Sequence, residues 1–173
     1  MKWVFKNRYL FLTVVGTWVV FLDRVTKKLI TDRFALGESQ VVIPHLFDLT
    51  YVQNKGAAFG FLAHTDPAFR DPFFIIVPCL ALVGVFYIFL KISERAYLVI
   101  TAMSLIISGA IGNLLDRLEL GYVVDFLYFH WYSAYYPAFN VADSAICIGV
   151  AIALWDAFMD KKNSKKAISC IRF

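Results

Sequence analysis

Long apolar stretches alternate with polar segments along this chain of 173 residues. Each stretch has roughly the 20 residues that a helix needs to cross about 30 Å of hydrocarbon. Charged side chains gather mainly near the ends of these stretches. The pattern predicts an all-α integral membrane protein with four transmembrane helices, at about residues 9–30, 72–90, 96–115 and 138–159.

Two longer intervals, 31–71 and 116–138, separate the helices and are polar or aromatic in character. Alternation of apolar and polar residues within them predicts half-exposed strands at 47–52 and 123–129. At the start of the second helix, Asp71 is expected to be the N-cap and Pro72 the first helical residue.

Composition and charge agree with a membrane protein. The chain is 60% hydrophobic and 17% charged, with a mean hydropathy of +0.66, which excludes an ordinary soluble domain. The net charge is +4, but the basic residues flank the apolar stretches instead of forming a nucleic-acid face. These flanks carry Lys2, Lys6, Arg8, Lys91, Arg95, Lys161, Lys162, Lys165 and Lys166.

The four spans also predict the orientation of the chain. An even number of spans puts both termini and all of the basic flanks on one side, which the positive-inside rule makes cytoplasmic. The intervals 31–71 and 116–138 are then extracytoplasmic. Residues 1–173 are expected to form a single multi-pass membrane domain. A monomer is expected, because the sequence contains no long helix of the kind that joins subunits.

Two aspartates, Asp125 and Asp143, lie beside long apolar segments, where carboxylates are costly and usually functional. A helix rises about 1.5 Å per residue, so Asp143, 16 residues before Met159, lies about 24 Å from the cytoplasmic end. Asp125 follows Asn113 by twelve residues and can fold back to the same level. Both carboxylates are therefore expected at the outer end of the helices.

Two neighbouring carboxylates suit acid–base hydrolysis of a peptide bond. They cannot both ionise easily, so one keeps a proton while the other acts as a base, and their pKa values belong to the pair. Such a pair activates a water molecule and protonates the leaving amine. The alternative is structural: each aspartate caps a helix or pairs with Arg117.

Further polar residues cluster near the outer ends of the first and third spans. Asp23 and Lys27 are four residues apart on one helical face and are expected to form a structural ion pair rather than a catalytic one. Asn113 and Arg117 share a face in the same way, with Asp116 adjacent. Arg117 has three possible partners, which are a loop carbonyl, Asp116 and a lipid phosphate, and support of the site is the favoured role.

Asparagines close to the two aspartates are candidates for orienting them. Asn140 lies one turn before Asp143. Asn54 and Gly56 belong to a small-residue segment, which either forms a plain tight turn or approaches a substrate backbone closely.

Other chemistries find little support in the sequence. No His-Glu-x-x-His or Cys-x-x-Cys motif occurs, so no metal site or cofactor is expected. Ser108 lacks a histidine within the spans to serve as its base, and a Ser–Lys pair would need Lys27, which already has Asp23. The histidines and cysteines are scattered, at His45, His64, His130, Cys79, Cys147 and Cys170.

Five short blocks, occurring in the family's order, resemble the signature blocks of lipoprotein signal peptidases, the type II signal peptidases of bacteria. The likeness runs from the first predicted span to the fourth. The blocks are Asp23-Arg-Val-Thr-Lys27, Asn54-Lys-Gly-Ala-Ala-Phe59, Gly112-Asn-Leu-Leu-Asp-Arg117, Val123-Val-Asp-Phe126 and Phe139-Asn-Val-Ala-Asp143.

This resemblance implies an aspartyl endopeptidase of the bacterial inner membrane. Its expected substrates are prolipoproteins with a diacylglyceryl cysteine, cut just before that cysteine, and globomycin-type peptides are expected inhibitors. It implies a small extracytoplasmic β-cradle, which the predicted strands fit, and a catalytic pair at Asp125 and Asp143. The supporting or substrate-binding residues that it implies are Asp23, Lys27, Asn54, Gly56, Asn113, Asp116, Arg117 and Asn140.

Two other function classes remain as alternatives. A proton-coupled transporter or channel would also explain intramembrane charges, but it predicts polar residues at mid-depth in several spans. The interiors of the second and third spans carry only Thr101, Ser104 and Ser108. A scaffold for other membrane proteins leaves the two aspartates unexplained.

Overall fold

The computed structural model describes residues 7–56, 62, 65–93, 96–132 and 134–169, with side chains as far as Met159. Several sequence predictions concern residues outside these ranges. They include the basic residues of the first six positions and part of the block that follows Asn54. Also outside are His64, Arg95, Cys170 and the side chains of Lys161, Lys162, Lys165 and Lys166.

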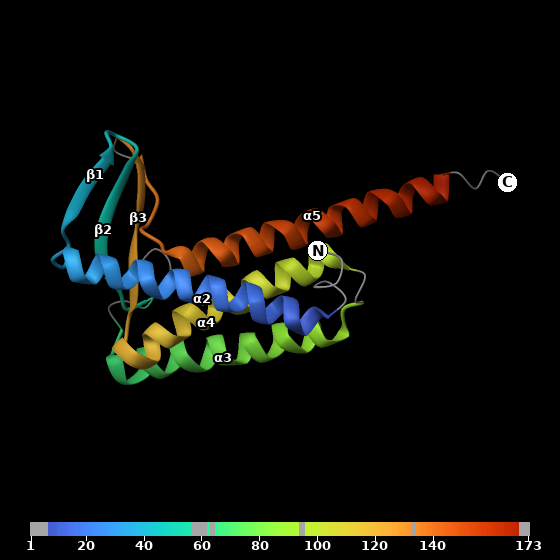
Figure 1. Cartoon of the computed structure of the whole chain (residues 1–173), viewed down its shortest axis with the longest axis horizontal. Helices are drawn as coiled ribbons and strands as arrows, with labels where there is room; N and C mark the ends of the chain where they lie inside the picture. The colour runs from blue at the N-terminus through green and yellow to red at the C-terminus, as the bar shows by residue number, and fades with distance from the viewer. Residues whose placement is uncertain (1–6, 57–61, 63–64, 94–95, 133, 170–173) are drawn as a thin grey trace.

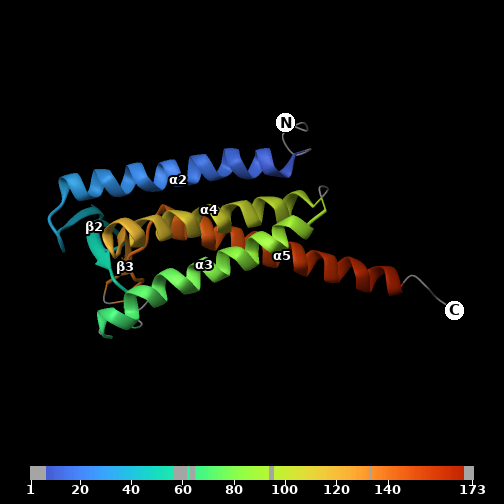
Figure 2. The ribbon, with the colours of Figure 1, turned by 90° about the horizontal axis from the view of Figure 1, so that it is seen from below.

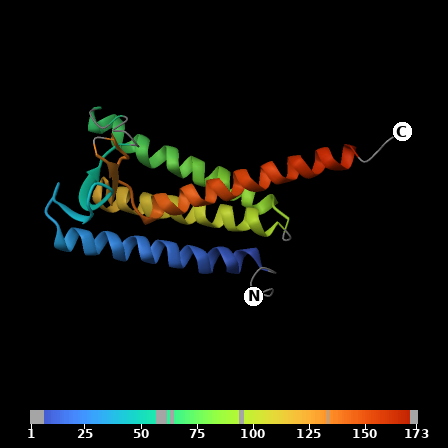
Figure 3. The same cartoon turned by 90° about the horizontal axis from the view of Figure 1, so that it is seen from above.

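Four helices form the body of the protein (Figure 1). Each contains a stretch that is long and apolar enough to cross a membrane, which in the last helix is Val141–Met159. Helix α4 lies between α2 and α3 and also packs along α5, which extends past the ends of the others (Figures 2 and 3). The helices are α2 (Arg8–Arg33), α3 (Pro67–Lys91), α4 (Tyr97–Leu120) and α5 (Val141–Ser169).

Helix α3 begins five residues earlier than its sequence predicts. The expected N-cap at Asp71 is wrong, because Asp66 accepts the N–H of Ala68 and Pro67 takes the first helical position. The Asp71 carboxylate instead receives the guanidinium of Arg70, with N–O distances of 2.8 Å. Two consecutive Asp-Pro pairs carry the same local signal, and the earlier one starts the helix.

A small antiparallel sheet lies at one end of the helices, opposite the two chain termini (Figure 1). Its strand order is β1-β2-β3-β4. The predicted strands at 47–52 and 123–129 correspond to β2 and β3, whereas β1 and β4 have no counterpart among the predictions. The strands are β1 (Ser39–Ile43), β2 (Phe47–Asn54), β3 (Val123–Trp131) and β4 (Ala134–Tyr135). Four apolar helices with this sheet confirm the predicted fold class.

Two backbone features bring the sheet onto the ends of α4 and α5. Gly121 ends α4 in the left-handed region at φ +79°, which glycine adopts without strain, and β3 follows two residues later. The carbonyl of Phe139 then accepts the N–H groups of Phe126 (3.0 Å) and Leu127 (2.8 Å). The start of α5 is thereby fixed beside the first half of β3.

Small residues allow α4 and α5 to pack closely. A Cβ atom placed on Gly109 would lie 2.3 Å from the carbonyl oxygen of Ala142, and one on Gly149 would lie 2.7 Å from that of Ala102. Close backbone approach of this kind is the usual basis of helix association in membranes, where burial of apolar surface gives little driving force.

We expect Gly109→Ala to lower the stability of the folded protein by about 1–3 kcal/mol, because the added methyl group meets a backbone oxygen that cannot move aside. Thermal unfolding of the detergent-purified protein measures this. Gly84→Ala is the matched control, since a Cβ there has nothing within 4 Å. Equal unfolding temperatures for the two variants would show that the α4–α5 contact tolerates expansion.

Candidate active site

Asp125 is the third residue of β3, and its side chain is buried below the sheet. Its two carboxylate oxygens accept one amide each: Asn54 Nδ2 donates to Oδ2 at 2.9 Å, and Asn140 Nδ2 donates to Oδ1 at 2.7 Å. The donors come from β2 and from the residue preceding α5. Two elements other than its own strand therefore fix the orientation of this carboxylate.

Asp143 lies in the first turn of α5 and forms a reciprocal capping box with Asn140. The Asn140 side-chain oxygen accepts the N–H of Asp143 at 2.9 Å, and Asp143 Oδ2 accepts the N–H of Asn140 at 3.2 Å. Its other oxygen accepts Asn113 Nδ2 at 2.7 Å. Asp143 thus takes part in capping α5, which is the structural alternative considered for it in the sequence. Its Oδ1 atom contacts Asn113 at the same time.

Asn140 links the two aspartates. It bonds Asp125 through its side-chain amide and Asp143 through its backbone N–H. The same amide nitrogen lies 3.1 Å from Asn113 Oδ1, so the two asparagines also contact each other. Asn140 is fully buried, and its contacts hold the two carboxylates on either side of one residue.

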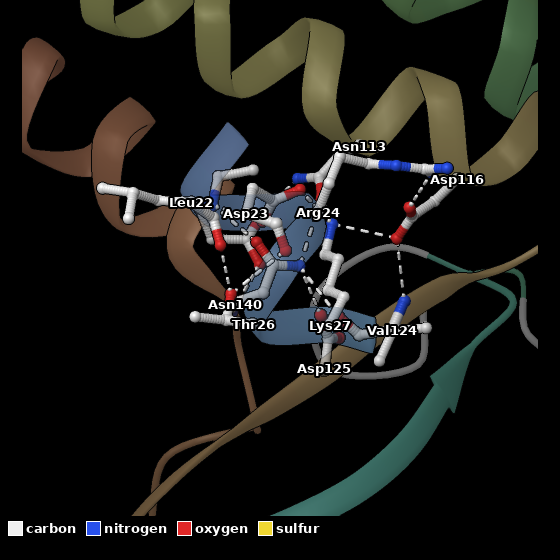
Figure 4. Close-up of polar contacts among 12 residues, drawn as sticks. Leu22, Asp23, Arg24, Thr26, Lys27, Asn113, Asp116, Val124, Asp125 and Asn140 are labelled. Atoms are coloured by element: carbon white, nitrogen blue, oxygen red, sulfur yellow. Dashed lines mark hydrogen bonds and ion pairs between the residues drawn. The ribbon is translucent and has the colours of Figure 1, made fainter. Parts of the chain in front are cut away.

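A buried lysine lies behind this pair, between two further carboxylates (Figure 4). Lys27 Nζ is 2.7 Å from Asp23 Oδ2 and 2.9 Å from Asp116 Oδ2. The expected Asp23–Lys27 ion pair is therefore present. Asp116 was considered in the sequence as a partner of Arg117. In the structure it pairs with Lys27 instead. All three side chains are nearly inaccessible to solvent.

The carboxylates of this triad bind the backbone next to each aspartate of the pair. Asp23 Oδ1 accepts the N–H of Ala142 at 2.9 Å, one residue before Asp143. Asp116 Oδ2 accepts the N–H of Val124 at 3.2 Å, one residue before Asp125. The triad therefore connects α2 and α4 to β3 and α5 at the two positions where the aspartates are held.

Lys27 also sets the orientation of Asn113. Its ammonium donates to Asn113 Oδ1 at 3.1 Å. Because an amide carries its oxygen and its nitrogen on opposite sides, this bond turns the Asn113 NH₂ group toward Asp143. The lysine thus acts on Asp143 through Asn113.

Arg117 contacts the chain that follows β2. Its Nη2 donates to the carbonyl of Gly56 at 2.9 Å, and its guanidinium lies 4.9 Å from the centre of the Phe74 ring. Of the three partners considered for Arg117, the loop carbonyl is the one that it binds. Gly56 N–H in turn donates to Asn54 Oδ1, so this turn also orients the amide that reaches Asp125.

The environment of Asp125 favours its protonated form. Burial and the nearby Asp143 carboxylate raise the pKa of Asp125 to about 7, although the amides of Asn54 and Asn140 and the charge of Lys27 act in the opposite direction. A carboxyl group with this pKa retains a proton for a large fraction of the time near neutral pH.

Comparisons with known proteins assign the chain to a family. The sequence pattern of the family described as signal peptidase (SPase) II matches residues 15–159. The lipoprotein signal peptidase of Syntrophotalea carbinolica is 48% identical over 86% of this chain and 91% of its own length. That of Neisseria meningitidis is 41% identical over 93% and 95%, respectively. The chain belongs to the signal peptidase II family.

Solved structures support the same assignment. A bacterial membrane enzyme determined by the in meso method superposes on this chain with a TM-score of 0.79 and 34% identity, covering 88% of this chain and 90% of its own. A second such structure gives a TM-score of 0.76 and 32% identity. Membership of the signal peptidase II family makes the chain a membrane peptidase, which decides against the transporter and scaffold alternatives.

In this signal peptidase II chain, the two aspartates open onto a cleft of about 940 Å³. Asn54, Asn113 and Arg117 also line it, as do Ser39, Thr50, Tyr128 and Tyr135 of the sheet and the following Tyr136. Within the described residues, no group of three or more His, Cys, Asp or Glu side chains is placed to hold a metal ion. The cleft lies at the sheet end of the apolar helices and is lined by both polar and apolar side chains.

Arg24 and the tyrosines that line the cleft were not identified from the sequence. Arg24 lies 3.4 Å from Asp116 and 2.5 Å from Glu119, so it adds a second cation at the edge of the triad. No local spacing signals this contact, because Arg24 and Asp116 are 92 residues apart. Tyr128, Tyr135 and Tyr136 lie in the interval 116–138, whose aromatic character does not by itself indicate that they line a cleft.

We expect Lys27→Met to destabilise the protein by about 3–5 kcal/mol, because Asp23 and Asp116 would stay buried without their shared cation. Thermal unfolding in detergent measures the change. Lys28→Met is the matched control, since the Lys28 side chain is 75% exposed and pairs with the exposed Asp32. Its expected effect is within about 0.5 kcal/mol. If both variants unfolded at the same temperature, the triad would not contribute to the stability of the protein.

Proposed function

We propose that Asp125 and Asp143 are the catalytic pair of an endopeptidase that removes the signal peptide from diacylglyceryl-modified bacterial prolipoproteins. The cut falls just before the lipidated cysteine. The observation that carries this proposal is the placement of two carboxylates around Asn140, in a cleft at the boundary between the apolar helices and the polar sheet. Family membership supplies the substrate class.

The environments of the two carboxylates support different roles for them. Asp143 lies at the N-terminus of α5, where the helix dipole favours a negative charge, and it accepts N–H donors at both oxygens. Asp125 is more deeply buried and has a raised pKa. We therefore infer that Asp125 carries the shared proton and that Asp143 acts as the base.

Hydrolysis then proceeds by general acid–base catalysis. The Asp143 carboxylate takes a proton from a water molecule, whose oxygen attacks the carbonyl carbon of the scissile peptide bond. The proton of Asp125 stabilises the negative charge that develops on the carbonyl oxygen. The tetrahedral intermediate collapses as Asp143 passes the proton that it took from water to the leaving nitrogen, which becomes the free amine of the lipidated cysteine. Both carboxyl groups then return to their starting state.

The position of the cleft suits a substrate that is anchored in lipid. The diacylglyceryl chains remain in the hydrocarbon layer while the peptide bond reaches the polar end of the helices. We place this end on the extracytoplasmic side of the bacterial inner membrane, with both termini in the cytoplasm, because Arg8 and Lys91 lie at the other end. Globomycin-type peptides are expected inhibitors, and a monomer over residues 1–173 is the expected functional unit.

We expect Asp125→Asn and Asp143→Asn each to reduce cleavage of a diacylated prolipoprotein by at least about 100-fold, because each removes one proton-transfer group. A gel-shift assay with purified enzyme in detergent measures the rate, and thermal unfolding checks that the variants fold. Asp32→Asn, on the exposed end of α2, is the control and should cleave at the normal rate. Near-normal cleavage by Asp125→Asn would exclude the proposed pair.

We expect kcat/KM to fall as the pH rises through about 7, because Asp125 then loses the proton that the mechanism needs. Asn54 donates to the ionised form of Asp125, so Asn54→Ala should raise this pKa further and move the alkaline limb upward by about one pH unit. The pH dependence of kcat/KM for both proteins measures the shift. An alkaline limb at the same pH in Asn54→Ala would mean that another group sets it.

A further inference from the structure

We propose that a groove between α2 and α3 binds an anionic phospholipid of the surrounding membrane, with an acyl chain along the groove and the phosphate at its basic mouth. This groove and the catalytic cleft have no lining residue in common. It is built by the α2, α3 and α4 segments near the end that carries Arg8 and Lys91. The proposal goes beyond the peptidase activity and does not depend on the catalytic pair.

The groove has a volume of about 680 Å³ and an almost entirely apolar wall. Leu12 and Val20 of α2 face Leu82 and Phe86 of α3, and Ile107 of α4 contributes to the lining. Figure 2 shows α2 and α3 on the two sides of α4, and α2 and α3 diverge from each other along α4. Because the wall lies within the membrane-crossing segments, its occupant must be apolar.

Two hydroxyl groups of the wall donate to backbone carbonyls and therefore do not need water as a hydrogen-bond acceptor. The Thr13 hydroxyl donates to the carbonyl of Tyr9 at 2.9 Å, and the Ser108 hydroxyl donates to that of Ser104 at 2.5 Å, each within its own helix. Gly16 keeps the floor open, since a Cβ there would lie 3.2 Å from the Ser108 hydroxyl. A dry, elongated surface of this kind fits a hydrocarbon chain.

Two cations flank the mouth of the groove. Lys91 folds back so that its Nζ lies 5.3 Å from the centre of the Tyr87 ring, which itself lines the groove. Arg8 lies one turn before Leu12 on α2 and donates to the carbonyl of Ile92 at 2.6 Å, a bond that leaves its charge uncompensated.

Neither cation is paired with a carboxylate among the described residues, and Arg8 Nε is buried without a hydrogen-bond partner there. Basic residues beside an apolar groove at a membrane surface provide a complement to an anionic headgroup, and each such residue contributes appreciably to its attraction. A zwitterionic lipid would add its own ammonium group next to Lys91 and Arg8. The charge of the mouth therefore selects an anionic phospholipid.

The headgroup contact is tested by native mass spectrometry of the full chain in detergent, titrated with phosphatidylglycerol or phosphatidylethanolamine. We expect tighter binding of phosphatidylglycerol, and an increase of its Kd by about fivefold in Lys91→Gln. Lys28→Gln, at the opposite end of α2, is the matched control and should bind as the natural chain does. Equal affinity for the two lipids, or an unchanged Kd in Lys91→Gln, would overturn the proposal.

A second pair of variants tests the groove itself. Val83 lines it and is 68% exposed, whereas Leu80 is 66% exposed on the same helix and does not line it. Val83→Trp should fill the groove and reduce phosphatidylglycerol binding at least fivefold, and Leu80→Trp should not. Equal lipid binding by the two variants would overturn the proposal.

The same experiments would recognise other occupants of the groove, and each of these would also overturn the lipid proposal. A dimer that Val83→Trp alone disrupts would assign the groove to a second copy of the chain. A raised KM for prolipoprotein in Val83→Trp, with lipid binding unchanged, would assign it to the apolar helix of the substrate.

Discussion

The buried ammonium of Lys27 between Asp23 and Asp116 is the interaction on which the rest of this structure depends. Each of these charges alone would be costly inside a helical bundle in hydrocarbon. Together the three form short contacts, and Arg24, which also pairs with Glu119, adds a partly exposed cation at the edge. Because loss of either carboxylate would leave the buried lysine without its full charge compensation, the sheet-side ends of α2 and α4 are held together.

The remaining bonds of these carboxylates extend this constraint to Asp125 and Asp143, the proposed catalytic pair. Asp23 binds the backbone beside Asp143, and Asp116 binds the backbone beside Asp125. The two aspartates come from different elements, a helix start and a strand, and neither element alone fixes their relation. A peptidase that uses two carboxylates and water needs them held at a constant separation. The triad provides that rigidity without lining the cleft.

The asparagines act between the triad and the cleft. Asn113 takes its orientation from Lys27, and Asn140 contacts both aspartates. Amides carry no net charge, so they orient the two carboxylates without forcing both to ionise. The pKa of Asp125 can therefore stay near 7 although the side chain accepts two hydrogen bonds. In this way the buried charges of the triad lie next to the two aspartates that we propose as the catalytic pair.

The sequence by itself determined the four spans, two of the four described strands and the Asp23–Lys27 pair, and it named the two aspartates that we propose as catalytic. Hydrophobic length, strand alternation and i,i+4 spacing are local properties, and the family's blocks lie within short segments. Tertiary structure decided which carboxylate meets which cation. Asp116 pairs with Lys27 and Arg24 instead of the neighbouring Arg117, and the N-cap of α3 is Asp66. These choices depend on contacts between residues far apart in the chain, whose energies follow from burial and distance and are therefore absent from any local pattern.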